Sequence, residues 1–398
     1  MVGSASIKTI QISIVIVLIL SCSRNETSKI NSLPNCFSET EFTMDSLFSD
    51  IRFIPLSSEI PFSKTVDIIW YDSLFYLSTY AGKIFAFNEL GLLKESYCKQ
   101  GRGPDEYGNI VNFIIIDDSI YINSGVNKKI KVYDLHLNFQ RDIPYPKGFT
   151  RGDITYLDST IFLFSRTAFK KPLYDWLAIN RYGIVLGSKV YNGSDISPCF
   201  ESSNFSIQVL SNNIIYHYRI DADTIFKIIS PKKEIPILLI DREYCDGTRM
   251  HSQSELGTTI SIDGRREITK ILEIGNKWLI MYFINNRPAI TETVLFDPIS
   301  NKSQLVSRIA PLRHYPFSIG IPFDWAGTGY LDPRLSMKIN LDTYVVCLVS
   351  AYDIIQFTMS ESFKNCKPTK PEVKNKLLDL SKTISIDDNP VLILLKVR

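Results

Sequence analysis

The chain has 398 residues, of which 45% are hydrophobic and 22% are charged, and its formal net charge is +2. This is the composition of a globular protein with enough apolar material for a large core. Lys and Arg are scattered among nearly as many Asp and Glu, so the basic stripe typical of nucleic-acid-binding proteins is missing and we expect no nucleic-acid partner.

The first predicted element is an apolar run from Ile10 to Leu20, preceded by one positive charge at Lys8. The run is shorter than the about 20 residues that span a bilayer, but it has the length of a signal-peptide core. It ends in LILSC, which resembles the lipobox of bacterial lipoproteins. The resemblance implies cleavage before Cys22 and lipidation of this residue, whose acyl chains anchor a soluble domain to a membrane. An ordinary signal peptide or an uncleaved anchor is the alternative.

The sequence therefore predicts a lipoprotein signal peptide (1–21), a tether (22–38) and one globular domain (39–398). The polar stretch SRNETSKINS after Cys22 is expected to lack structure of its own. The other six cysteines are far apart and form no CxxC pair, so zinc and thioredoxin-type chemistry are unsupported. Cys347 lies in the apolar run YVVCLVS and is expected to be a buried thiol.

A pattern of strands recurs along the domain at a spacing of roughly 40 to 65 residues, the range of propeller blades with loop insertions. Each copy has an inner strand, such as 65–71 or 109–116, and then a polar turn pair. A run of β-branched and aromatic residues follows the turn: DSLFYLST, DSIYINSG, DSTIFLFS, SNNIIYHY, GNKWLIMY and LDTYVVCL. A third strand, a tight turn and an outer strand complete the unit.

Six such units predict an all-β fold, a six-bladed β-propeller with four-stranded antiparallel blades. A seven-bladed ring and a pair of β-sandwiches are the alternatives. After the sixth unit we predict a helix at 371–384 and a late strand of the final blade from Asn389. The strand at 50–57 has no unit of its own, so we expect this N-terminal strand to close the last blade and remove its open edge.

The chain resembles the six-bladed β-propeller lipoproteins common in Bacteroidetes. The resemblance rests on LILSC, on the GRGPDEYG loop (101–108) between the first two units, on VYDLHLNF and on the terminal DDNPVLILLKV. It covers nearly the whole mature chain, and its most specific element is the loop, which is similar to a G-x-GP-x-EY pattern. It implies a cell-envelope location, most specifically an outer-membrane lipoprotein that is periplasmic or surface-exposed, and the genes of such proteins are often found near those of outer-membrane nutrient-uptake systems. It implies no particular activity.

The GRGPDEYG loop is neither a phosphate loop nor a dinucleotide fingerprint, because no Lys-Ser or Lys-Thr pair follows its last glycine and strands surround it. We expect it to join the outer strand of one blade to the inner strand of the next, near the mouth of the central channel. Two interpretations remain open: a ligand site, or a staple in which Arg102 pairs with Glu106 and Tyr107 packs between blades. On the first interpretation the candidate ligand-binding residues are Arg102, Asp105, Glu106 and Tyr107, together with Trp325 and Tyr330 of DWAGTGYLDP, whose rings suit sugar or peptide stacking.

No enzymatic motif supports catalysis. The four histidines share no metal-ligand spacing, and the chain has no GxSxG elbow and no cysteine-nucleophile motif. The sequence thus predicts no catalytic residue, no metal site and no cofactor. The leading hypothesis is a lipid-anchored envelope module that contacts the membrane through Cys22 and binds a glycan, a peptide or an envelope protein. The alternative is a propeller hydrolase or lyase acting on glycans.

Overall fold

The computed structural model describes residues 31–33, 37–38, 41–62, 64–125, 127–150, 152–165, 173–191, 206–211, 214–219, 223–240, 266–284, 290–309 and 319–398. All of them belong to one compact unit, Asn31–Arg398. The predicted lipidation site at Cys22 and the predicted signal peptide lie outside the described residues. No helix in these ranges is both long and apolar enough to cross a membrane.

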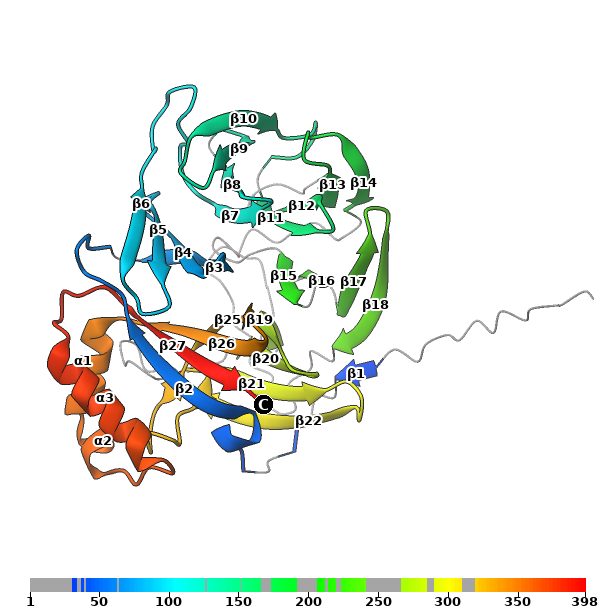
Figure 1. Cartoon of the computed structure of the whole chain (residues 1–398). Coiled ribbons are helices and arrows are strands. Elements are labelled where there is room, and N and C mark those ends of the chain that lie inside the picture. The colour runs from blue at the N-terminus through cyan, green and yellow to red at the C-terminus, as the bar shows by residue number, and fades with distance from the viewer. Residues whose placement is uncertain are drawn as a thin grey trace, which may run out of the picture. The chain divides into compact units, whose positions relative to one another are not determined.

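Six antiparallel sheets are arranged in a ring, which confirms the predicted six-bladed β-propeller (Figure 1). Blade 1 consists of β3 (Thr65–Tyr71), β4 (Leu74–Thr79), β5 (Ile84–Asn88) and β6 (Leu93–Tyr97). Blade 2 consists of β7 (Asn112–Ile116), β8 (Ser119–Ser124), β9 (Lys129–Asp134) and β10 (Phe139–Pro144). Blade 3 consists of β11 (Gly152–Leu157), β12 (Thr160–Ser165), β13 (Tyr174–Ile179) and β14 (Val185–Val190).

The second half of the ring repeats this order, with one strand added to blade 4. Blade 4 consists of β15 (Ser206–Ser211), β16 (Ile214–Arg219), β17 (Thr224–Ser230) and β18 (Lys233–Ile240), and β1 (Asn31–Leu33) pairs with β18 as a fifth, parallel strand. Blade 5 consists of β19 (Arg266–Ile274), β20 (Lys277–Ile284), β21 (Ile290–Asp297) and β22 (Lys302–Ile309). Blade 6 consists of β25 (Pro333–Ile339), β26 (Asp342–Val349), β27 (Val391–Val397) and β2 (Phe48–Pro55).

The polar turn pairs found in the sequence are the hairpin turns after the inner strands. Asp72 and Ser73 have φ of 45° and 61°, and Asp158 and Ser159 have φ of 47° and 65°. Two successive positive φ values are typical of the type I′ turn, whose twist matches that of the flanking strands. In blade 2 the turn pair is Asp117–Asp118, one residue earlier than the DS pair that the sequence pattern indicates.

Each hydrophobic cluster of the core lies between two neighbouring blades. Because side chains alternate across a strand, each middle strand supplies both of its interfaces. In β5, for example, Phe85 and Phe87 pack toward blade 6, whereas Ile84 and Ala86 pack toward blade 2. The other interfaces repeat this arrangement, so the six clusters together account for the six contacts of the ring.

The last blade contains strands from both ends of the chain, as predicted. β2 pairs antiparallel with β27 from Phe48 opposite Val397 to Pro55 opposite Val391. The segment before β2 also contacts the ring: Ser38 bridges to Gln304 on blade 5, and Met44 is buried between blades 5 and 6. We call the described parts of residues 31–47 the N-terminal strap. Because β1 falls within the segment 22–38, which we expected to be an unstructured tether, ordered structure begins before residue 39.

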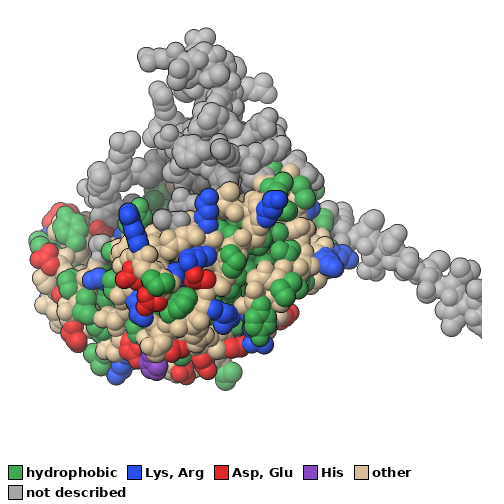
Figure 2. Space-filling view, turned by 90° about the horizontal axis from the view of Figure 1, so that it is seen from above, with side chains coloured by type: hydrophobic (Ala, Val, Ile, Leu, Met, Phe, Trp, Pro, Cys, Tyr) green, Lys and Arg blue, Asp and Glu red, His purple; other side chains and the backbone are tan. Residues whose placement is uncertain are grey.

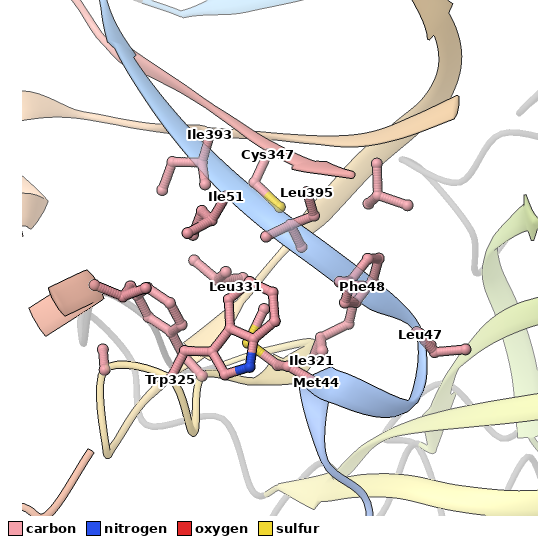
Figure 3. Close-up of a cluster of buried hydrophobic side chains, with 14 of the residues drawn as sticks. Met44, Leu47, Phe48, Ile51, Ile321, Trp325, Leu331, Cys347, Ile393 and Leu395 are labelled. Carbon is pink, nitrogen blue, oxygen red and sulfur yellow. The ribbon is translucent and has the colours of Figure 1, made fainter. Parts of the chain in front are cut away.

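Helices occur between β26 and β27. The predicted helix is α3 (Pro371–Thr383), and two shorter helices precede it, α1 (Ala351–Met359) and α2 (Glu361–Asn365), with a 3-10 turn η1 (Met44–Ser46) near the N-terminus. Ser350 and Ser360 cap α1 and α2 by accepting backbone N–H bonds of 3.0 and 3.2 Å. Together with the segment of β23 (Ile321–Pro322) and β24 (Tyr330–Leu331), the helices fill the interface between blades 5 and 6 (Figure 3).

Candidate functional site

The GRGPDEYG loop connects β6 of blade 1 to β7 of blade 2, as the sequence indicated. Its centre is Tyr107, which is fully buried in the cluster between these blades. The Tyr107 hydroxyl donates to the Gly82 carbonyl at 2.8 Å, in the β4–β5 turn, and accepts the Lys99 N–H at 3.2 Å. Its ring packs edge-on against Tyr133 of β9, with 6.0 Å between ring centroids. Tyr107 therefore connects blade 1 to blade 2.

A tyrosine hydroxyl is neutral at physiological pH, and burial raises the pKa of Tyr107 further, to about 12, so the phenol keeps its proton and donates a hydrogen bond to the Gly82 carbonyl. Two backbone hydrogen bonds join the start and the end of the loop. The Gly101 N–H donates to the Tyr107 carbonyl at 2.9 Å, and the Tyr107 N–H donates to the Lys99 carbonyl at 3.0 Å. These bonds hold both ends of the loop together and fix its middle in one position.

Glu106 contributes to the same closure from inside the loop. Its carboxylate accepts the Gly103 N–H at 2.6 Å. A Cβ at position 101 would lie 1.9 Å from the Glu106 Oε2 atom, so a glycine at 101 is needed for this approach. The expected Arg102–Glu106 pair does not form: within the described part of the chain, Arg102 makes no ion pair. The packing of Tyr107 that the staple interpretation predicts is present, and its Arg102–Glu106 pair is not.

Two buried side chains of blade 2 donate hydrogen bonds to backbone carbonyls of the loop. Tyr133 donates its hydroxyl to the Asp105 carbonyl at 2.9 Å, and Lys131 donates to the Pro104 carbonyl. Lys131 is fully buried and is neutralised by Asp142 at 3.1 Å. Because the backbone of 104–105 is held in this way, the side chains at these positions are presented to solvent on a rigid support.

The outer surface of this support carries unpaired cations and an aromatic ring. Tyr80, in the β4–β5 turn, is 78% exposed, and its N–H donates to the Lys64 carbonyl at 2.9 Å. Lys64 and Arg102 are exposed, and Lys83 is half-buried. Lys83 follows Gly82 in the β4–β5 turn, and the side chain of Gln100, two residues before Arg102, packs against Gly82. We call Lys64, Tyr80, Lys83 and Arg102 the junction surface. Among the described residues, no carboxylate lies within ion-pair distance of its three cations.

The acidic residues near the junction surface are already engaged. Asp105 is exposed but lies 3.7 Å from the Lys99 Nζ, and Glu106 accepts the backbone bond described above. The junction surface thus has a net positive charge that the described residues do not neutralise. Its members Tyr80, Lys64 and Lys83 were not singled out in the sequence, where YAGK is simply a turn after a strand; a large aromatic at the tip of a tight turn is the signal that was available.

The two aromatic candidates of the other loop lie elsewhere in the molecule. Trp325 is fully buried between blades 5 and 6, among Met44, Ile321 and Leu331 (Figure 3). The Lys370 Nζ lies 3.4 Å from the centroid of its ring and also 2.9 Å from Asp45. Tyr330 is half-buried in β24 and pairs with Pro322. The structure therefore does not bring Trp325 together with the GRGPDEYG loop, and ligand binding by Asp105, Glu106 and Tyr330 stays a prediction.

A second polar cluster joins blades 3 and 4. Glu234 of β18 is mostly buried and accepts bonds from Lys189 at 2.7 Å and from the Trp176 indole at 2.8 Å, both on blade 3. His217 lies 3.8 Å from the same carboxylate. Burial alone would raise the pKa of Glu234, but the interactions with His217, Lys189 and Trp176 outweigh it and lower the pKa to about 2. The carboxylate is an ion-pair partner rather than a general base.

No metal centre is evident in the described ranges, where no three His, Cys, Asp or Glu side chains are grouped to hold an ion. Three cysteines lie in these ranges, and all are free thiols: Cys98 is exposed, Cys366 is half-buried and Cys347 is buried, as predicted. Burial raises the pKa of Cys347 well above its usual range, so this thiol is not a nucleophile.

A family profile described as a domain of unknown function, DUF4934, matches residues 28–396. The chain belongs to the DUF4934 family. The match includes β1 and the N-terminal strap, so the family domain begins before residue 39, in agreement with the strand at Asn31–Leu33. We found no curated protein whose sequence matches this DUF4934 chain.

Two solved structures from Bacteroides are similar to this DUF4934 propeller. One is a Bacteroides fragilis protein whose name describes it as a candidate exported protein; it is 15% identical, the match covers 93% of this chain and 99% of that one, and the TM-score is 0.66. The other is a member of the DUF4221 family from Bacteroides vulgatus, 10% identical, with 88% and 97% of the chains covered and a TM-score of 0.50. At these identities the likeness shows the fold, and it supports the expected relation to propellers of Bacteroidetes.

Proposed function

We propose that this protein is an exported, lipid-anchored envelope module that binds an acidic glycan at the junction surface. The observation that carries the proposal is the junction surface: the exposed ring of Tyr80 and three cations without an ion-pair partner among the described residues, next to or on the loop that Tyr107 holds in place. A tyrosine ring stacks on the apolar face of a sugar, and Arg and Lys bind carboxylate or sulfate groups. Loops on a rigid scaffold are the usual place for binding residues.

The cellular setting is supported by two further observations. The apolar run and LILSC at the N-terminus resemble a lipoprotein signal, and one structural neighbour bears the name of a candidate exported protein. An envelope location would expose the junction surface to the acidic polysaccharides of the cell surroundings. We therefore propose that the protein takes part in glycan uptake by binding these polysaccharides at the cell envelope.

The proposal is tested by calorimetric titration of the membrane-extracted protein with uronate and sulfated oligosaccharides, and with neutral oligosaccharides of the same length. We expect the acidic ligands to bind, and to bind more weakly as ionic strength rises. Tyr80→Ala and Arg102→Ala should each weaken binding by roughly tenfold, because a stacked ring or a charge-assisted hydrogen bond contributes on the order of 1.5 kcal/mol.

Matched controls come from the helical segment between β26 and β27, where Tyr352 and Lys367 are exposed. Tyr352→Ala and Lys367→Ala should bind as the natural protein does. Tyr107→Phe tests the support of the loop separately, since it removes the bond to Gly82 without changing the junction surface. If no acidic oligosaccharide binds, or if the Tyr80 and Arg102 variants bind as well as the controls, the proposed function is wrong.

A further inference from the structure

Two neighbouring blades share an amphipathic rim. In blade 3, the turn between β13 and β14 exposes Tyr182 and Ile184, which are 68% and 62% accessible, and Val185 follows at 49%. Exposed cations flank these side chains: Arg181, Lys232 and Lys233. We call these six residues the amphipathic rim. Apolar side chains exposed side by side on a protein surface are typical of an interaction site.

The rim is continuous across the boundary between the blades. A Cβ at Gly187 of β14 would lie 1.7 Å from the Pro231 carbonyl of blade 4 and 3.0 Å from the Lys232 side chain, so the outer strand of blade 3 touches the β17–β18 turn of blade 4 at this point. Lys189 and Glu234 connect them a little further along, with 2.7 Å between Nζ and Oε1. Tyr182 also stacks with the Arg181 guanidinium, 5.7 Å from its ring centroid.

The rim presents positive charge without exposed carboxylates. In the described stretches 173–191 and 229–240, the acidic residues are Asp175 and Glu234, and both side chains are buried. Figure 2 looks onto the side of the molecule that carries β10 and β14, where green hydrophobic side chains reach the surface near blue Lys and Arg side chains. A surface that combines aromatic and aliphatic side chains with unpaired cations fits the headgroup region of an anionic bilayer.

The N-terminal strap determines where an anchor would hold the ring. β1 pairs with the outer edge of blade 4, with Asn31 opposite Leu238. Only residues 23–30 separate this strand from Cys22, and eight residues span at most about 29 Å when extended. If Cys22 carries the lipid, as the proposed function requires, the outer edge of blade 4 lies within that distance of the membrane.

We propose that the amphipathic rim rests on the surface of the membrane in which Cys22 is anchored. Tyr182, Ile184 and Val185 enter the interface, and the three cations contact lipid phosphates. Blade 1 lies opposite blade 4 in the ring (Figure 1), so the junction surface faces away from the bilayer. The inference depends on the lipid anchor of the proposed function but not on its glycan ligand.

The test is amine labelling of the lipidated protein, followed by mass spectrometry, in vesicles of phosphatidylglycerol and phosphatidylethanolamine. The reference is the same protein in neutral detergent micelles. We expect acetylation of Lys232 and Lys233 to be severalfold slower in the vesicles, whereas Lys83 and Lys367, which lie elsewhere on the surface, label at an unchanged rate. The double variant Tyr182→Asp, Ile184→Asp should lose this protection while its melting temperature stays that of the natural protein.

If Lys232 and Lys233 label in the vesicles as fast as in the micelles, while the vesicles retain the protein, the rim contact is overturned and the anchor is left intact. The Cys22→Ser chain is the unanchored control and should stay in the supernatant when the vesicles are sedimented. If the natural protein also stays in the supernatant, the anchor and the rim contact are overturned together. Glycan binding is measured by calorimetry on the detergent-solubilised protein and does not depend on either result. Failure of this inference is therefore distinguishable from failure of the ligand assignment.

Discussion

Single side chains decide how neighbouring blades are held at their polar contacts. Tyr107 joins blades 1 and 2 through a neutral hydroxyl, whereas Glu234 joins blades 3 and 4 through a charge. The first contact is independent of pH in the physiological range because a tyrosine hydroxyl is neutral there, and burial raises the pKa of Tyr107 further. The second depends on pH at acid values, since the ion pair with Lys189 needs the ionised carboxylate.

The pKa of Glu234 is lowered, so the stability that its ionised form contributes is fully present above the unfolded value of 4.5 and is lost as pH falls toward about 2. We expect Glu234→Gln to destabilise the protein by roughly 3 kcal/mol at pH 7, following the size of the shift. The difference from the natural protein should shrink steadily between pH 4.5 and 2. Urea unfolding at a series of pH values measures it.

The matched control is Glu372→Gln, at an exposed position of α3. This variant should be within about 0.5 kcal/mol of the natural protein at every pH. A Glu234→Gln effect that is the same at pH 3 and pH 7 would show that the bonds to Lys189 and Trp176 do not depend on the charge.

The two N-terminal strands β1 and β2 have different structural roles. β2 completes blade 6 by pairing with β27 along its whole length. β1 adds a short parallel strand to the edge of blade 4, where Leu33 is buried in the cluster between blades 4 and 5. Loss of β2 exposes the edge of β27 and removes Phe48, Ile51 and Ile54 from the two interfaces of blade 6, whereas loss of β1 removes Leu33 from the interface between blades 4 and 5.

Two truncated chains distinguish the contribution of β2 to stability from that of β1. A chain beginning at residue 57, without β2, should aggregate or fail to fold cooperatively. A chain beginning at residue 41, which keeps β2 and lacks β1, should unfold cooperatively with a stability lower by about 2 to 5 kcal/mol, the cost of losing a buried leucine side chain. Circular dichroism and denaturant unfolding distinguish the outcomes. Cooperative folding of the shorter chain would mean that blade 6 does not need its fourth strand.

The whole ring is closed by strands from opposite ends of the chain. The Arg398 N–H donates to the Leu47 carbonyl at 3.0 Å, so the C-terminus lies beside the start of β2. To open the ring between blades 5 and 6 or between blades 6 and 1, the natural chain must either separate β2 from β27 or stretch a covalent connection. The closure thus links the breaking of a blade interface to the loss of strand hydrogen bonds.

A circular permutant of the 41–398 chain removes this link and keeps every strand of that chain. It starts at Ile60, continues to Arg398, passes through a flexible glycine-serine linker and ends with residues 41–59. All strand pairs of the 41–398 chain are kept, but blades 6 and 1 are no longer joined covalently, so their interface can open alone. We expect native circular dichroism and severalfold faster unfolding in denaturant than for the 41–398 chain, measured by stopped-flow fluorescence. Equal unfolding rates would show that strand closure does not control the opening of the ring.

Much of this architecture follows from the sequence because its signals are local. Polar pairs such as Asp72–Ser73 adopt the positive φ values of a hairpin turn through their own backbone preferences, and the alternating runs after them define strands. The helices α1 and α2 were missed because AYDIIQFTM continues an apolar, strand-like run, although Ser350 and Ser360 are helix caps. The position of the loop between two blades was also predictable from the order of the strands.

The exposure of the site residues was decided only by the tertiary structure. Tyr107 and Trp325 are buried because Gly82, Tyr133, Met44 and Lys370 reach them from distant parts of the chain. Tyr80 is exposed because nothing in the described ring covers its turn. A turn or a strand depends on a few neighbouring residues, so the sequence by itself determined the blades. Burial and charge pairing depend on residues that meet only when the ring closes, so they could not be read from the sequence.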